Sequence, residues 1–404
     1  MSKPRLGELF AYRQFIFFWL ARLSAMLAQQ MLMVAVAWQM YDITGSAWDL
    51  GLVGLFQFVP ALLLTLPAGH LVDRLRRSWI FSGCVLAQGG VALLLLLATE
   101  NGFISRELIL GLSILLGACR AFQMPAQQAL VPMLVPAALL ERAVTLSTTG
   151  MQVAVICGPA LGGVIYVAGA QMVHGTCAGL MLLAFALMQG VHDQYQPSQE
   201  TTTLSSVLAG VHFVWTKKLL LGAISLDLFA VLLGGATALL PIYARDILHT
   251  GPQGLGLLRA APAAGALLMS IMMLRWPIRR KVGPWLMGSV AAFGLATVVF
   301  GLSEHFGLSL IALAITGAFD NISVVMRQTL VQLETPNEIR GRVSAVNSIF
   351  IGASNQLGEF ESGATAALLG PVGSVVMGGV GTLFVALAWT RLFPGLARRD
   401  RMLG

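Results

Sequence analysis

Four acidic residues stand inside long apolar stretches of the sequence, where a charge is costly. They are Asp227, Asp320, Glu359 and Glu361. A carboxyl group in such surroundings can exchange a proton for a cationic or polar molecule, and ionisable residues in apolar segments often mark ion or substrate pathways. We therefore predict a proton-binding or substrate-binding site there, with no metal and no cofactor. The alternative for each acid is a structural hydrogen bond or ion pair that fixes helix packing.

Two arginines stand in similar stretches and could balance these acids. Arg120 lies about halfway along its apolar run, and an arginine at that depth costs at least about 2.5–3.5 kcal/mol. Arg327 follows Asp320 by seven residues, which places both on one helical face. Two pairings are open, because Asp320 could pair with Arg327 along its helix or with Arg120 across a cavity. Asp227 has no charged neighbour at helical spacing.

The other ionisable groups of the apolar stretches are harder to assign to a single site. Glu359 and Glu361 are two residues apart, about 200° around a helix, so both cannot line one cavity. Arg22 and Arg259 fit counter-charges or residues whose long side chains reach toward the membrane surface. All six histidines stand at or near predicted loops, which argues against a histidine proton relay.

The composition identifies the elements that must position these residues as membrane helices. Of the 404 residues, 57% are hydrophobic and 11% are charged, and the mean hydropathy is +0.80. Soluble domains carry about 25% charged residues, so the composition excludes a soluble enzyme, a disordered chain and a nucleic-acid-binding domain. An all-α membrane protein with twelve crossings is predicted. The apolar runs are 15–40, 48–71, 79–99, 107–132, 143–168, 172–191, 219–244, 254–274, 284–303, 307–332, 343–368 and 371–392.

The lysines and arginines predict the orientation of these crossings. Nineteen of the 25 basic residues fall at the N-terminus, at the C-terminus or in loops on the same side as the termini. By the positive-inside rule both termini are then cytoplasmic. The net charge of +7 reflects this topology and contact with anionic lipid, and no nucleic-acid partner is expected.

An internal repeat predicts two halves. Gly117 and Gln128 recur 200 residues later as Gly317 and Gln328, and the run Leu-Gly-Leu at 50–52 recurs at 255–257. Two parallel six-helix halves are a transporter plan. We expect an N-terminal bundle at 1–191, a cytoplasmic linker at 192–218 and a C-terminal bundle at 219–404. Apolar residues at helical spacing over 204–215 fit either a helix lying flat on the membrane or an early start of the seventh crossing.

The segment Gly69-His70-Leu71-Val72-Asp73-Arg74-Leu75-Arg76-Arg77 is predicted as the loop between the second and third crossings. A glycine allows a tight turn, and an acid among bases can form contacts that exist in only one of two states. We predict a cytoplasmic gate there; a plain basic loop is the alternative. The residues expected to form the gate are Gly69, Asp73, Arg74, Arg77, Arg142 and Arg342.

The fifth crossing carries Gly158-Pro159-Ala160-Leu161-Gly162-Gly163. Proline removes a helical hydrogen bond, and glycines permit close helix contact. Gly158, Pro159, Gly162 and Gly163 are therefore expected to form a hinge or a seal.

These motifs resemble those of the major facilitator superfamily. The segment from Gly69 is similar to its G-x-L-a-D-R-x-G-R-K signature, with Arg76 and Ser78 departing from it. Arg120 and Gln123 fit an exporter pattern R-x-x-Q-G, from which Met124 departs. With the fifth crossing and the stretch 335–358, the chain resembles the branch that contains siderophore exporters and proton-coupled multidrug exporters. The resemblance implies alternating access and proton-driven export of a small amphipathic molecule, by a monomer among the lipids of the bacterial inner membrane.

Two other functions are alternatives to export. An importer or facilitator could use the same fold. A lipid-modifying enzyme would need a catalytic pair at the membrane edge, for which His70 beside Asp73 is the sole candidate; no enzymatic activity is expected.

Overall fold

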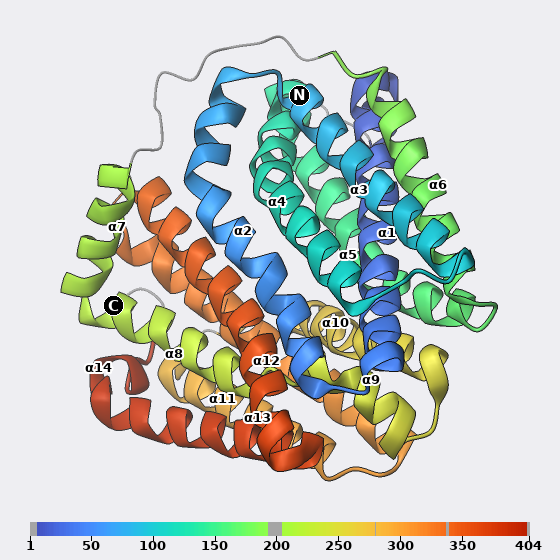
Figure 1. The fold of residues 1–404 in the computed structure, drawn as a ribbon. Helices are drawn as coiled ribbons and strands as arrows, with labels where there is room; N and C mark the ends of the chain where they lie inside the picture. Colours follow the sequence, from blue (N-terminus) through green and yellow to red (C-terminus); the bar gives the residue numbers. More distant parts are fainter. Residues whose placement is uncertain (1–5, 193–203, 279, 337–338, 402–404) are drawn as a thin grey trace. The chain divides into compact units, whose positions relative to one another are not determined.

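A computed structural model describes residues 6–192, 204–278, 280–336 and 339–401 (Figure 1). Within these ranges the chain is almost entirely helical. In a hydrocarbon environment backbone groups must find their partners inside the segment, and a helix provides this. Eleven helical segments of the described residues are long and apolar enough to cross a membrane. The last of them, Arg340–Leu392, contains two crossings, which gives the predicted total of twelve.

The chain divides into two compact units. The first comprises Met1–Ile43 and Phe56–Thr202, and the second comprises Thr44–Leu55 and Thr203–Gly404. The first part of α2 is thus grouped with the second unit, and the domain boundaries expected from the sequence stay a prediction. The first six long helices are α1 (Arg13–Thr44), α2 (Ala47–Arg74), α3 (Arg77–Glu100), α4 (Arg106–Leu130), α5 (Leu140–Tyr166) and α6 (Ala170–Met188).

The helices that follow are α7 (Leu204–Thr216), α8 (Lys218–Gly234), α9 (Leu240–Ile242), α10 (Gly251–Arg275), α11 (Val282–Gly301), α12 (Phe306–Glu334), α13 (Arg340–Leu392) and α14 (Pro394–Ala397). In this unit α8, α11, α12 and α13 pack around one apolar core. Its fully buried members include Leu226, Leu286, Met326 and Leu330.

Helix α13 is two crossings joined end to end. Its 53 residues include Gly370, whose φ of 76° and ψ of 163° are not helical. A positive φ is readily adopted only by glycine, so the chain turns there and Pro371 follows at the start of the next helix. The turn falls between the predicted crossings 343–368 and 371–392.

The seventh crossing is not the continuous helix predicted over 219–244. Helix α8 ends at Gly234, and Gly235 is non-helical with φ −74° and ψ 67°. Two short helices and a π-helical turn, Tyr243–Ile247, complete the crossing. The carbonyl freed at Gly235 accepts a hydrogen bond from the Ser362 hydroxyl at 2.7 Å, so the break is stabilised by the neighbouring α13.

The internal repeat is visible in matching helix contacts. A Cβ on Gly117 would clash with the backbone carbonyl of Gln57, so α4 packs closely on α2 in the first unit. A Cβ on Gly317 would clash with the carbonyl of Pro262, so α12 packs equally closely on α10 in the second. Gly317 follows Gly117 by 200 positions, and Pro262 follows Gln57 by 205. These are the two offsets found in the sequence.

The predicted linker lies largely outside the described residues, because 193–203 are not described. Helix α7 follows and is separate from α8, since Lys217 between them has extended backbone angles. Val211 and Val214 on α7 pack against an apolar cluster that includes Leu220 of α8 and Val346 of α13. The early-start interpretation is therefore wrong, and the position of α7 at a membrane surface stays a prediction.

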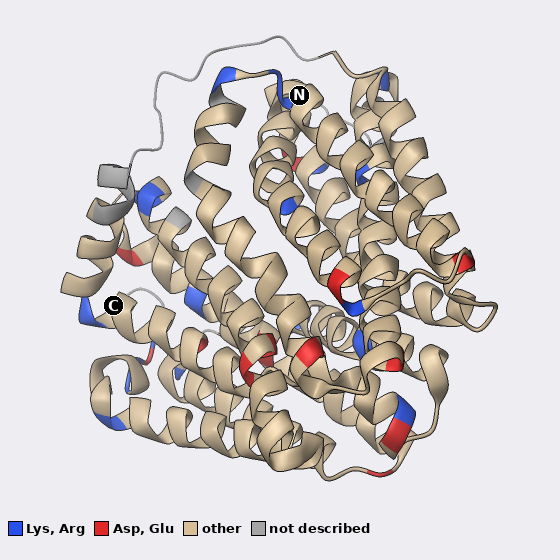
Figure 2. Ribbon diagram, in the orientation of Figure 1, with Lys and Arg blue, Asp and Glu red and all other residues tan. Residues whose placement is uncertain are grey.

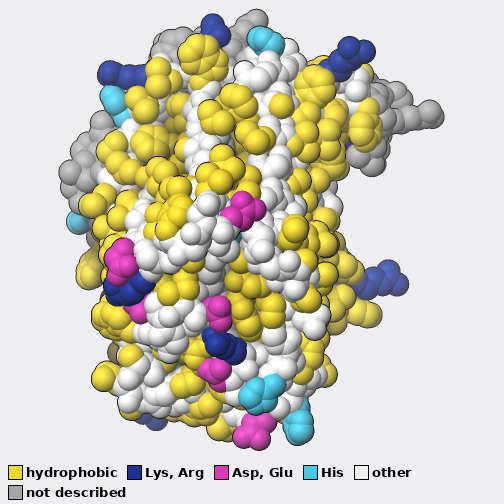
Figure 3. All heavy atoms as spheres, turned by 45° about the vertical axis from the view of Figure 1, so that its right-hand side comes forward, with side chains coloured by type: hydrophobic (Ala, Val, Ile, Leu, Met, Phe, Trp, Pro, Cys, Tyr) yellow, Lys and Arg dark blue, Asp and Glu magenta, His cyan; other side chains and the backbone are white. Residues whose placement is uncertain are grey.

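Charged residues are sparse along the crossings. Figure 2 shows long stretches of helix without Lys, Arg, Asp or Glu, with many of the charges at helix ends. The face shown in Figure 3 is dominated by hydrophobic side chains, with a few charged groups among them. This pattern fits a protein whose solvent is lipid over most of its height.

Candidate functional site

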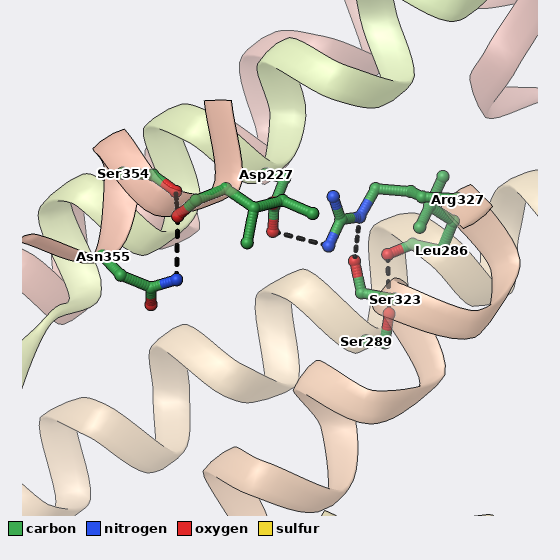
Figure 4. Close-up of polar contacts among 8 residues, drawn as sticks. Asp227, Leu286, Ser289, Ser323, Arg327, Ser354 and Asn355 are labelled. Carbon is green, nitrogen blue, oxygen red and sulfur yellow. Dashed lines mark hydrogen bonds and ion pairs between the residues drawn. The ribbon is translucent and has the colours of Figure 1, made fainter. Parts of the chain in front are cut away.

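The buried charges of the second unit centre on an ion pair between α8 and α12. A guanidinium nitrogen of Arg327 lies 2.5 Å from Asp227 Oδ1, and the two side chains are only 4% and 8% exposed. Arg327 Nε also donates to Ser323 Oγ at 3.1 Å. Figure 4 shows the Arg327 guanidinium lying between Asp227 and Ser323. A buried pair of this kind persists only with close geometry and additional hydrogen bonds, both of which are present.

Asp320 lies beside this pair without joining it. It shares with Asp227 and Ser323 a small cavity lined also by Ser289 and Phe293, with room for about one water molecule. Its carboxyl interacts electrostatically with Asp227 and Arg327. Among the described residues, however, no hydrogen bond or ion pair engages the Asp320 side chain. The cavity therefore holds one carboxylate that is paired and one that has no described bonding partner.

Asp320 and Arg327 do not pair along their helix. Seven residues separate the two by about 10.5 Å along the axis, and Asp227 offers a shorter approach from the neighbouring helix. Sequence spacing could not find this partner, because Asp227 is a hundred positions away. The other alternative, Asp320 with Arg120, would join the two units and stays a prediction.

The remaining acids of α13 have different surroundings. Glu359 interacts electrostatically with Arg259 of α10, which supports a counter-charge role for that arginine. Glu359 also lies close to Gly54, in the part of α2 that belongs to the second unit. Glu361 is half-buried, and among the described residues its carboxyl has no bonding partner. The two acids thus have different surroundings, and the expectation that both cannot line one cavity stays a prediction.

The first unit holds a polar network of three amides, which the sequence patterns did not predict. Gln29 Nε2 donates to Gln88 Oε1 at 2.8 Å and to Gln123 Oε1 at 2.7 Å. Gln88 Nε2 donates to Gln123 Oε1 at 2.8 Å. Gln88 and Gln123 are buried, so the network links α1, α3 and α4 inside the bundle. Arg120 stands one turn before Gln123 and has an exposed side chain.

A second network contains a buried histidine. His174, near the start of α6, is fully buried, and its Nε2 lies 2.9 Å from Gln39 Oε1. Gln39 Nε2 donates to the Thr99 hydroxyl, which donates to the Leu95 carbonyl. Nε2 of His174 must then be the donor to Gln39, and Nδ1 is left without a described partner. This histidine sits near a loop, as predicted, and it joins α6 to α1.

The glycine motif of α5 packs against α1. A Cβ on Gly158 would press on Gln30, and a Cβ on Gly162 would meet the backbone of Met31. Pro159 and Gly163 are buried beside them, and the helix continues unbroken to Tyr166. The motif thus forms a close helix contact, and its action as a hinge stays a prediction.

Replacing Gly162 by Leu is expected to destabilise the first unit by about 1–3 kcal/mol, because the backbone of α1 cannot yield to the added atoms. Gly179 on α6 has open space around it, so Gly179→Leu is the matched control. Unfolding temperature in detergent measures both. Equal stability of the two variants would contradict the close contact.

The predicted gate loop is mostly helix. Helix α2 runs to Arg74 and α3 starts at Arg77, so Gly69 lies inside α2 and makes no tight turn. The predicted role of Gly69 in a turn is therefore wrong, because the helical pattern extends through the motif. The side chain of Asp73 lies outside the described part. Arg77 donates to the sulfur of Met133, Arg74 and Arg342 are exposed and Arg142 is half-buried. Gate function stays a prediction for all of them.

In the second unit the loop between α10 and α11 corresponds to the predicted gate loop. The acidic residue that contacts it is Asp400, from the C-terminal segment. Asp400 Oδ1 accepts from the backbone N–H of Lys281 at 3.1 Å, and the Asp400 and Arg399 carbonyls accept from Val282 and Gly283. Asp400 also lies 3.6 Å from the Arg280 guanidinium. The segment thus caps the first turn of α11. No acid occurs within 275–281, so the sequence around α11 could not reveal this contact.

Removing this cap by Asp400→Ala is expected to cost about 1 kcal/mol locally and to speed hydrogen exchange at the amides of 281–283. The exposed Glu304→Ala serves as control. Unchanged exchange at these amides in the Asp400 variant would show that the cap contributes nothing.

The arrangement of crossings is that of known transporters. The chain superposes on the nucleoside transporter NupG with a TM-score of 0.71 at 13% identity, covering 94% of this chain and 99% of that one. A bacterial homologue of the human lysosomal transporter Spinster gives 0.73 at 14% identity, covering 98% and 99%. The chain therefore shares its fold with these transporters. The family model that residues 9–397 match places it in the major facilitator superfamily, whose members are multi-pass membrane proteins.

Within that class the family is defined by sequence. Residues 9–397 match the family of transmembrane secretion effectors, and the chain belongs to it. It is 26% identical over 392 residues to the enterobactin exporter EntS of Citrobacter koseri, covering 94% of this chain and 91% of the relative. It is 28% identical over 394 residues to the multidrug efflux pump Tap of Mycobacterium tuberculosis, covering 93% and 90%.

Proposed function

We propose that this chain is a proton-coupled exporter of a small amphipathic molecule in the bacterial inner membrane. The observation that carries the proposal is Asp320, a carboxyl that shares a cavity with the Asp227–Arg327 pair and has no described bonding partner. The names of EntS and Tap, an exporter and an efflux pump, support the direction.

The geometry supports different roles for Asp227, Arg327 and Asp320. Asp227 and Arg327 neutralise each other, and Ser323 fixes the guanidinium. The cluster is then neutral when Asp320 is protonated and carries one negative charge when it is not. Because burying an unpaired charge is costly, proton binding at Asp320 changes which conformation of the transporter is favoured. Protonation from the periplasmic side would accompany substrate release and return to the inward-open state.

Import or facilitated diffusion is the alternative function. The solved structures with this fold include the nucleoside transporter NupG and a D-xylose-proton symporter, so the fold itself does not select a direction. The same helices and carboxyl cluster would serve export, with substrate and proton moving in opposite directions, or import, with both moving in the same direction.

Flux in oriented membrane vesicles separates these functions. The substrate is sought by screening catecholate and hydroxamate chelators and cationic dyes. Inside-out vesicles with an acidic lumen should accumulate it, and their pH gradient should collapse during this uptake. Vesicles from cells with an empty vector provide the background. Accumulation only in right-side-out vesicles, driven by protons entering with the substrate, would establish import.

A further inference from the structure

The two units differ in the charges that their crossings carry far from the helix ends. In the described part of the first unit these are Arg22 on α1 and Arg120 on α4, and no acid accompanies them. In the second unit Asp227, Asp320, Glu359 and Glu361 outnumber Arg259 and Arg327. The acids that would balance the first unit's arginines are therefore absent from its own described crossings.

Both arginines lack a charged partner within the described part of their own unit. Arg120 has an exposed side chain and makes no ion pair within the described part of the first unit. The Nε of Arg22 is buried without a hydrogen-bond acceptor, and its other described contact is a 4.0 Å approach to the sulfur of Met151. An unpaired guanidinium in a membrane segment is expected to face a wet cavity or a ligand.

The polar residues of α4 share one side of this helix, on which Ser113, Gln123 and Gln127 are buried and Arg120 is exposed. At 100° per residue Ser113, Arg120, Gln123 and Gln127 fall within about 80° of the helix circumference. Ile114 and Leu115 lie on the opposite side, and their side chains are 44% and 42% exposed. The apolar side is the one suited to lipid, so the exposed Arg120 side chain does not belong to the lipid-facing surface.

The amide network holds this polar face in place. Gln123 is buried, and its Oε1 accepts from both Gln29 and Gln88, whereas its Nε2, one turn from Arg120, has no described partner. Gln127, one turn further on, has a buried Oε1 without a partner. A guanidinium beside an amide donor on a fixed helix face suits a carboxylate, phenolate or similar anion, which Arg binds through charge-assisted hydrogen bonds.

We propose that the polar face of α4, centred on Arg120 and Gln123, binds an acidic group of the transported molecule. The substrate class is then an amphipathic anion or zwitterion, and a purely cationic amphiphile would lack the group that this face recognises. The inference rests on the proposed transport function and adds the chemistry of the substrate's polar end.

Equilibrium binding of two matched dyes tests the proposal. Rhodamine B carries a free carboxylate, and its methyl ester is the same fluorophore with the carboxylate masked. Binding to the purified full-length protein in detergent is measured by fluorescence polarisation, without any proton gradient. The wild type should bind rhodamine B more tightly than the ester. Arg120→Gln should weaken rhodamine B binding about ten-fold or more and leave ester binding unchanged.

Two further variants control for folding and for general charge effects. Arg106→Gln removes a half-buried arginine at the start of α4, paired with Glu107 at 3.7 Å, and should leave both affinities unchanged. Arg120→Lys keeps the charge and should recover part of the affinity. Tighter or equal binding of the ester, unchanged rhodamine B binding in Arg120→Gln, or no measurable rhodamine B binding would each overturn the proposal. A failure of proton-driven export in vesicles would leave this binding result standing, so the two proposals fail separately.

Discussion

Replacing Asp320 by Asn is expected to abolish proton-driven transport, by about a hundred-fold or more, while substrate binding survives. The amide has the shape of the protonated acid but cannot release a proton, so the movement of substrate is no longer tied to the movement of a proton. Exchange of labelled for unlabelled substrate across a proteoliposome membrane requires no net proton movement and should continue. Comparing gradient-driven uptake with this exchange separates loss of coupling from loss of folding.

Glu361 provides the matched control for this prediction. It is also a half-buried acid of the second unit without a described partner, but it does not line the cavity that Asp320 shares with Asp227. Glu361→Gln should retain gradient-driven uptake. Full uptake in Asp320→Asn with loss in Glu361→Gln would move the coupling role from α12 to α13.

Breaking the ion pair of α8 and α12 should have the largest effect on stability. Arg327→Gln leaves Asp227 as a buried carboxylate without its cation, and such losses cost about 3–5 kcal/mol. The double variant Asp227→Asn with Arg327→Gln replaces the charged pair by two amides and should recover most of that stability. Thermal unfolding of the purified proteins in detergent, with the single and double variants side by side, measures the coupling between the two positions.

A surface pair calibrates this measurement. Arg106 and Glu107 are 3.7 Å apart with side chains 38% and 76% exposed, and pairs of this kind contribute at most about 1 kcal/mol. Glu107→Gln should therefore leave the unfolding temperature nearly unchanged. If Arg327→Gln behaved like Glu107→Gln, the Asp227–Arg327 contact would not be a buried ion pair.

The crossings were readily predicted because each is an apolar run bounded by turn residues. Gly370 falls between two predicted crossings, where its positive φ makes the turn. The break at Gly235 was missed because the run 219–244 is apolar almost throughout. The break is stabilised by a hydrogen bond from Ser362 to the Gly235 carbonyl. Ser362 lies 127 positions away, so no residue near Gly235 in the sequence indicates this contact.

Three charged residues that the sequence singled out lie together in the structure, but their pairing was not predicted, and their role in transport stays a prediction. Asp227, Asp320 and Arg327 stood out because a charge in an apolar run is rare. Helical spacing suggested Asp320 as the partner of Arg327, yet the partner is Asp227. Local spacing describes one helix, whereas this contact depends on how α8 packs against α12. The amide network of Gln29, Gln88 and Gln123 was not predicted for the same reason, because its members come from three helices.

Proton release on substrate binding tests coupling through Asp320 most directly. If substrate and proton compete through the two states of one transporter, each must weaken the binding of the other by the same factor. Purified protein in weakly buffered detergent solution is mixed with the strongest substrate of the vesicle screen, and a pH indicator records the change. Wild-type protein should release protons, and Asp320→Asn should bind the substrate without releasing any. Substrate binding with no proton release from the wild type, or with equal release from both proteins, would contradict this coupling.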